Sequence, residues 1–199
     1  REGYIADTAF SMDLENNDEN KKLINSAEDA LAKAVEKIDM EVSLREIGKA
    51  IEKAITSKGF QPIRNLSGHS IGRYDLHLGM NLPNYDNTKE AEIKEGLYAI
   101  EPFATTGVGS VKDGKPSGIY AVQKEGRVRE EFAREVLAFI LKEYKTLPFC
   151  ARWIYKKFGS RGVIALKRIE EAGIVHHYAQ LVERGAGKVA QAEHTVLIT

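Results

Sequence analysis

Three carboxylates lie in segments whose residue pattern predicts β-strands, where an acidic side chain is costly to bury. Glu101 shares its predicted strand face with three apolar residues: Leu97, Ala99 and Phe103. Asp7 lies in the same way between Ile5 and Ala9, and Glu193 lies near the end of the chain. A carboxylate on an apolar face costs several kcal/mol unless a cation or hydrogen-bond donors compensate it. A single acidic residue on a strand is more often structural or solvated, so these three are informative only together.

Two histidines, His69 and His77, are candidates for an imidazole ligand or a proton donor. His69 follows Gly68, and a glycine allows the backbone to approach another group closely. His77 lies eight positions later, an even spacing that places both rings on one side if the segment forms a single strand. A lone histidine in a loop is usually structural, and two near glycines improve the functional interpretation only slightly.

An imidazole and several carboxylates, spread from residue 7 to residue 193, form a donor set of one recognisable kind. It suits a divalent ion such as Mn²⁺, Fe²⁺ or Co²⁺ better than it suits a Cys-rich structural zinc site. Spacing along the chain does not show that these side chains meet in space. The residues by themselves therefore leave a metal hydrolase as one open hypothesis.

The first part of the chain predicts the elements that would position Asp7 and His69. Residues 4–14 alternate between two faces, which is strand periodicity. Apolar residues recur at helical spacing over residues 23–38, and a second helix starts at Ser43, which forms a capping box with the glutamate three residues later. Gly59 is the predicted stop of that helix. Loops and short strands follow over residues 62–123.

The rest of the chain predicts a helical stretch between two β-rich stretches. Helices are expected over residues 128–144, 149–158 and 163–172. Short strands follow over residues 174–192, and the chain ends in a strand over residues 189–199. The fold class is therefore α+β with a helical insertion.

The composition fits one compact domain with an inserted subdomain. The chain has 199 residues, of which 43% are hydrophobic, and 29 basic residues balance 29 acidic ones. No charge surplus therefore indicates a nucleic acid or an anionic membrane as partner. No apolar run approaches the roughly 20 residues that span a bilayer, and residues 3–14 are too polar for a signal peptide. A single cysteine, Cys150, excludes an internal disulfide and favours a cytosolic location.

Four motif blocks occur in order along the chain. They are Gly3-Tyr4-Ile5-Ala6-Asp7-Thr8-Ala9, then Asn65-Leu66-Ser67-Gly68-His69-Ser70-Ile71 with Tyr74, Leu76, His77 and Gly79, then Ile100-Glu101-Pro102-Phe103-Ala104-Thr105, and finally Ala192-Glu193-His194-Thr195. Together they resemble the motif blocks of methionine aminopeptidases. The helical stretch resembles the insertion of the type II members, which are archaeal and eukaryotic, and the archaeal kind is favoured. The resemblance implies a pita-bread (creatinase/aminopeptidase-like) fold with a curved antiparallel sheet, outer helices and a winged-helix-like insertion.

The resemblance also implies a role for each candidate residue. Asp7 and Glu193 would bridge two metal ions, and His69 and Glu101 would ligate one of them. His77 would be the catalytic group that holds the peptide carbonyl or stabilises the tetrahedral intermediate. Two ions of Co, Mn, Fe or Zn per complete site would activate a bridging water and polarise the scissile carbonyl.

The implied substrate pocket is a small apolar socket for a methionine side chain. Substrate-binding candidates are His69, His77 and Phe103, with segment 71–74 added by its neighbourhood in sequence. For Phe103 a plain core role fits equally well. The implied enzyme is a metalloexopeptidase that removes the initiator methionine from nascent polypeptides in the cytoplasm. Its implied partners include the ribosome but neither DNA nor a membrane, and the complete protein would be a monomer.

The same resemblance sets the expected domain organisation. Residues 1–126 and 189–199 would form the catalytic domain, and residues 127–188 the helical insertion. The family pattern has a further aspartate ligand and an active-site histidine upstream of the first block. Because the chain opens with Arg1 and a predicted strand, we expect this upstream part to lie outside it. The 199-residue chain is then expected to bind at most one divalent ion tightly, to show little peptidase activity, and to associate through exposed sheet edges.

Three alternatives stay open at this point. The first is an Xaa-Pro peptidase of the same fold, although residues 76–84 and the helical stretch favour the methionine enzyme. The second is a catalytically inactive relative that keeps the fold as a protein- or RNA-binding module, although such relatives usually lose ligands that are present here. The third is nucleic-acid binding by the helical stretch, although interleaved glutamates indicate a solvated face. That third alternative would use these basic and aromatic residues: Arg161, Lys167, Arg168, Arg184, Trp153 and Tyr155.

Overall fold

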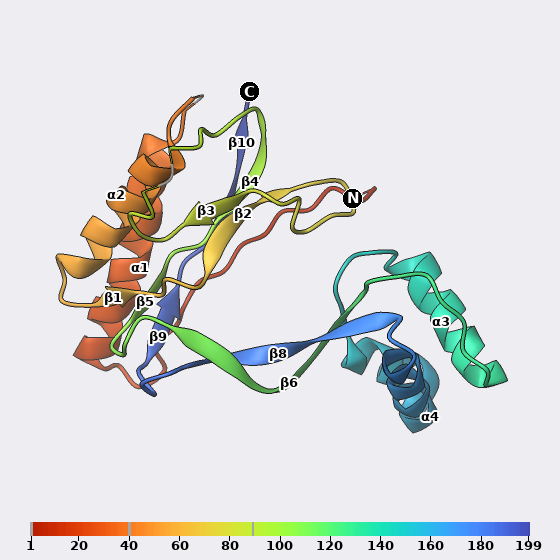
Figure 1. Cartoon of the computed structure of the whole chain (residues 1–199). Coiled ribbons are helices and arrows are strands. Elements are labelled where there is room, and N and C mark those ends of the chain that lie inside the picture. The colour runs from red at the N-terminus through yellow and green to blue at the C-terminus, as the bar shows by residue number, and fades with distance from the viewer. Residues whose placement is uncertain (1, 40, 89) are drawn as a thin grey trace. The chain divides into compact units, whose positions relative to one another are not determined.

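The computed structural model of the chain consists of two compact units (Figure 1). It describes every residue except 1, 40 and 89. The first unit is Arg1–Lys112 with Val182–Thr199, and the second is Asp113–Leu181. The insertion predicted at residues 127–188 overlaps the second unit, and its boundaries stay a prediction. None of the described helices is long and apolar enough to cross a membrane.

Two helices of the first unit confirm the predicted helices; the second starts as predicted, whereas the first starts at Asp18, ahead of its predicted apolar stripe. The helix α1 (Asp18–Lys37) is capped by Asn17, whose side chain accepts the backbone N–H groups two and three positions later at 2.8 and 3.2 Å. The helix α2 (Leu44–Thr56) is capped by Ser43, whose hydroxyl accepts the N–H three positions later at 3.2 Å. The predicted apolar stripe of α2 is buried: Leu44, Ile47, Ile51 and Ile55.

Two antiparallel sheets of the first unit lie beside these helices (Figure 1). One sheet has the order β10 (His194–Ile198), β4 (Gly96–Ile100), β2 (Ser67–Ile71) and β3 (Asn81–Pro83). The other has the order β1 (Gln61–Pro62), β5 (Phe103–Thr105) and β9 (Val189–Gln191). The buried residues of α1 and α2 share one hydrophobic core with residues from both sheets, among them Ile100 and Ala104. Burial of these apolar side chains fixes the helices on the sheets.

Residues 4–14 do not form the predicted strand. The structure gives this segment an isolated antiparallel bridge between Ala9 and Glu193. Exposure does alternate, with the even-numbered residues exposed and the odd-numbered ones half-buried. The exposed face is the more apolar one, since Phe10 is 75% and Leu14 is 87% exposed. No continuous strand forms because side-chain hydroxyls replace the ladder hydrogen bonds on both sides of the bridge.

The terminal segment 189–199, predicted as one strand, is two strands. The strand β9 pairs with β5, whereas β10 pairs with β4. The chain therefore passes from one sheet to the other at Ala192 and Glu193, which belong to neither strand. This change of sheet places Glu193 at the junction.

The second unit contains the predicted helical stretch and has its own core. Its elements are β6 (Val111–Val122), α3 (Glu131–Glu143), β7 (Phe149–Cys150), α4 (Ala151–Glu171) and β8 (Val175–Glu183), and both β6 and β8 continue into the first unit. The helix predicted to start at residue 149 starts two residues later, because β7 pairs with β6 instead. The predicted break between residues 158 and 163 is confirmed: Gly159 has φ 66° and ψ −160°, outside helical values.

We expect Gly48→Ala in α2 to destabilise the chain, although Ala has a higher helix propensity than Gly. A methyl group at this position would lie 2.2 Å from the carbonyl oxygen of Tyr85, in the loop after β3. Ala normally stabilises a helix relative to Gly by about 1 kcal/mol. Here we expect Gly48→Ala to destabilise the chain by about 1–3 kcal/mol in urea unfolding followed by circular dichroism. Lys49→Ala, at the exposed neighbouring position, is the control, and a Gly48→Ala chain as stable as the parent would refute the close contact.

Candidate metal centre

The structure brings the predicted carboxylates and His69 together within the first unit. Asp7 comes from the N-terminal segment, His69 from β2, Glu101 from the residue after β4, and Glu193 from the junction of β9 and β10. Sheet register explains the meeting. His69 pairs with Ala99 on β4, two residues before Glu101, and β10 pairs with the other edge of β4 directly after Glu193.

These four side chains form a compact cluster of oxygen and imidazole ligands. The His69 Nε2 atom lies 3.4 Å from a carboxylate oxygen of Glu101 and 3.9 Å from one of Asp7. One ligand atom each from Asp7, His69 and Glu193 lie within 4.8 Å of one another. In the described part of the chain, no Lys or Arg forms an ion pair with the three carboxylates. The cluster therefore gathers negative charge without a protein cation to balance it, which is the property of a site for a divalent ion.

The pKa values of the cluster reflect this crowding of charge. Burial raises the pKa of Glu101 to about 8, and the charges of Glu193 and then Asp7 add to the rise. Burial also raises the pKa of Glu193 to about 7, again with a contribution from Asp7. The pKa of His69 is lowered, first by burial and then by His77. All three shifts disfavour charge, and a bound cation would instead favour the charged carboxylates.

His77 lies beside the cluster, although not through the strand geometry that its spacing predicted. Its ring centroid lies 4.4 Å from that of His69, with the two rings at 63°. A single strand does not connect them, because β2 ends at Ile71 and the chain reverses direction. The reversal is visible in the hydrogen bond from the Leu78 N–H to the Ser70 carbonyl, 2.9 Å long. Unlike His69, His77 is exposed and accessible to a ligand.

Two neutral residues belong to the site and were not predicted from the sequence. The Gln191 amide lies 3.3 Å from a carboxylate oxygen of Glu101 and 3.3 Å from one of Glu193, and donates to both. The Thr195 hydroxyl forms hydrogen bonds with the backbone N–H and carbonyl of Asp7. Both residues lie two positions from Glu193, so the alternation of an extended chain was the signal that could have found them.

Phe103 lies on β5 directly opposite Gln191 on β9. Facing residues of an antiparallel pair project to the same side of the sheet. The half-buried Phe103 ring is thus on the side from which Gln191 reaches the carboxylates. A role of Phe103 in binding a substrate side chain stays a prediction.

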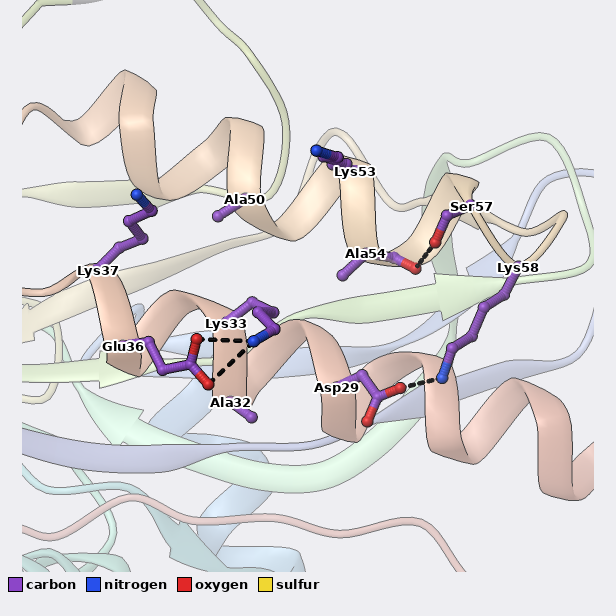
Figure 2. Close-up of a pocket in the computed structure, with 10 residues that line it drawn as sticks. All are labelled: Asp29, Ala32, Lys33, Glu36, Lys37, Ala50, Lys53, Ala54, Ser57 and Lys58. Carbon is purple, nitrogen blue, oxygen red and sulfur yellow. Dashed lines mark hydrogen bonds and ion pairs between the residues drawn. The ribbon is translucent and has the colours of Figure 1, made fainter.

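A groove of about 660 Å³ lies between α1 and α2, and none of the cluster residues lines it (Figure 2). Two of the four lysines on its walls are paired with acidic neighbours, Lys33 with Glu36 and Lys58 with Asp29. Its hydroxyl, that of Ser57, donates to a backbone carbonyl at 2.9 Å. Such pairing is typical of a solvated face, so the carboxylate cluster and not this groove is the candidate site.

Comparison with known proteins identifies the family of the chain. The sequence pattern of Metallopeptidase family M24 matches residues 1–199. The chain belongs to this family. Among M24 relatives, the methionine aminopeptidases of Methanocaldococcus jannaschii and Thermococcus kodakarensis are 44% and 42% identical to it over 100% and 99% of its length. The chain spans 66% and 67% of the length of these relatives, so the resemblance to archaeal methionine aminopeptidases is confirmed for that share.

Solved structures of M24-like fold confirm the pita-bread architecture. A thermophilic Arx1 matches 100% of the chain with a TM-score of 0.80 at 12% identity. The methionine aminopeptidases of Rickettsia prowazekii and Thermotoga maritima match 91% and 93% of it with TM-scores of 0.56 and 0.55, at 20% and 21% identity. At this low identity the likeness shows the fold alone. The winged-helix character of the insertion stays a prediction.

Proposed function

We propose that this chain forms the metal-binding core of an aminopeptidase that removes an N-terminal methionine from nascent polypeptides. The observation that supports the proposal is the cluster of three carboxylates around His69, with no Lys or Arg paired to it in the described residues. It occurs in a chain that is 44% identical to an archaeal methionine aminopeptidase.

The donor set fits divalent ions of the first transition series, because it combines carboxylate oxygens with an imidazole nitrogen. Asp7 and Glu193 are the proposed bridging ligands, and His69 and Glu101 the proposed ligands of one ion. Mn, Fe, Co and Zn all match this set. When bound, such ions supply an activated water and polarise the scissile carbonyl.

The residues around the cluster supply orientation and a proton donor. His77 is exposed and packs against the ring of His69, so its imidazole can donate to the carbonyl oxygen of a bound peptide. Gln191 keeps Glu101 and Glu193 at a fixed spacing by donating to both. Phe103, on the same side as Gln191, is the proposed apolar contact for the methionine side chain.

Calorimetric titration of the 199-residue chain with Mn²⁺ tests the metal centre. We expect one tight site per chain, because a second ion would share only the bridging carboxylates. Slow release of methionine from the peptide Met-Ala-Ser is expected, and EDTA should abolish it. The peptide Ala-Pro-Ser is the control for an Xaa-Pro peptidase. Two tight sites or rapid turnover would contradict the one-site expectation, and a chain that neither binds Mn²⁺ nor releases methionine would contradict the proposed function.

A further inference from the structure

The segment that contains Asp7 is joined to the end of the chain by an interrupted ladder. Ala9 and Glu193 exchange two backbone hydrogen bonds, of 3.4 and 2.8 Å. In a regular antiparallel ladder, the pairs two residues to either side exchange backbone bonds as well. In this structure those two pairs are joined by side chains instead: Asp7 with Thr195, and Ser11 with Gln191.

At both pairs a side-chain hydroxyl replaces the backbone-to-backbone hydrogen bonds of a regular ladder. Thr195 Oγ1 accepts the backbone N–H of Asp7 and donates to the carbonyl of the same residue, both at 2.7 Å. Ser11 Oγ accepts the N–H of Gln191 at 2.8 Å and donates to its carbonyl at 2.9 Å. Each hydroxyl satisfies both backbone groups of the facing residue, so a side chain stands between two segments that a regular ladder would join directly.

The two hydroxyl contacts differ in whether the backbone of the facing residue has other hydrogen-bond partners. Gln191 belongs to β9, where it also pairs with Phe103 on β5. Asp7 belongs to no strand, and within the described residues its backbone makes no hydrogen bond except those to Thr195. The Thr8 hydroxyl donates to the Glu193 carbonyl at 3.0 Å and holds the neighbouring residue, whereas the Thr195 hydroxyl contacts the backbone of Asp7 itself and so orients its carboxylate.

We propose that Thr195 is a positioning residue that holds the Asp7 carboxylate beside His69 and Glu193 for a divalent ion. The inference rests on the proposed metal centre. A side chain of equal volume without a hydroxyl leaves the N–H and carbonyl of Asp7 unpaired. The segment must then rotate or shift to satisfy them, and the Asp7 carboxylate moves away from the other ligands.

The test compares three substitutions by Mn²⁺ calorimetry and by thermal unfolding without metal. Thr195→Val keeps the shape and removes both hydrogen bonds, and we expect its Mn²⁺ affinity to fall about 10- to 100-fold. Thr195→Ser keeps the hydroxyl and should bind within about threefold of the parent chain. Ser11→Ala is the matched control, because it removes the equivalent contact on the other side of the bridge. It should lower the unfolding temperature about as much as Thr195→Val while leaving Mn²⁺ affinity within about threefold.

The outcomes separate the inference from the proposed function. A parent chain that does not bind Mn²⁺ overturns the proposed metal centre and this inference with it. A parent chain that binds, with Thr195→Val binding equally well, overturns the positioning role alone. Equal loss of affinity in Ser11→Ala also overturns it, because the effect would then follow from loosening the segment. If Thr195→Val does not fold, Thr195→Cys takes its place. A Thr195→Cys chain that binds Mn²⁺ at least as tightly as the Ser11→Ala chain would reject the positioning role.

Discussion

Glu193→Gln is expected to lower the Mn²⁺ affinity of the chain by at least about a hundredfold, since even outer partners of metal ligands contribute about 10- to 100-fold. Glutamine keeps the volume and removes the charge of the carboxylate that lies with Asp7 and His69 in one ligand group. The same change should stabilise the metal-free chain, because burial, and then the charge of Asp7, disfavour a charged carboxylate at this position. Calorimetry measures the affinity, and thermal unfolding with and without Mn²⁺ measures the opposite effect on stability.

Glu183→Gln is the matched control for this change, because Glu183 is a second buried glutamate of the first unit. Its carboxylate accepts four backbone N–H groups, at 2.6 to 3.2 Å, from two facing loops: Val108, Gly109, Gly185 and Gly187. Its amide variant should unfold at a lower temperature and bind Mn²⁺ as tightly as the parent chain. Unchanged Mn²⁺ affinity in Glu193→Gln would show that Glu193 is not a ligand.

The sequence predicts the helices of the first unit well, because their signals are local. Asn17 and Ser43 each cap a helix within three residues, and the apolar stripes follow directly. The strands are predicted less well, because pairing depends on a partner far along the chain. Residues 4–14 alternate as a strand does, but whether a ladder forms is decided by the hydroxyl of Thr195 and by Ser11.

The candidate site shows the same division between local and distant information. A carboxylate on an apolar strand face draws attention to Glu101, but its role as a ligand was predicted only together with the other carboxylates and from the family resemblance. Its meeting with His69 depends on the register of β2 and β4, which residue spacing does not contain. His77 shows this most directly, since an even spacing suggested one strand, and a chain reversal in fact places it against His69.

Gln191 and Thr195 were missed because a half-buried amide or hydroxyl on a strand costs little free energy. Such a residue therefore gives no signal in the sequence. Their function becomes visible only when their partners are known. Each is two residues from Glu193, so a search outward from a nominated ligand at the period of an extended chain would find both. The resemblance to a family nominated the charged ligands, whereas the geometry identified the neutral residues that hold them.

Without metal, the chain is expected to lose stability as the pH rises from 7 to 8.5. Burial and neighbouring charge raise the pKa of Glu101 to about 8 and that of Glu193 to about 7. In this range the folded chain holds protons that the unfolded chain has already released near pH 4–5. Unfolding therefore becomes easier as the pH rises, by about 1–2 kcal/mol over this interval. Urea unfolding in EDTA at several pH values measures the slope.

Glu101→Gln separates this effect from other titrations, because it removes the group with the larger pKa shift and keeps its shape. We expect the variant to lose most of the slope and to be more stable than the parent chain at pH 8.5 without metal. Mn²⁺ should remove the slope of the parent chain as well, since a bound cation favours the charged carboxylates and displaces their protons. The affinity of the parent chain for Mn²⁺ should therefore increase with pH. A metal-free chain whose stability is constant or rises over this range would show that Glu101 and Glu193 hold no protons in the folded chain above pH 7, which would contradict their raised pKa values.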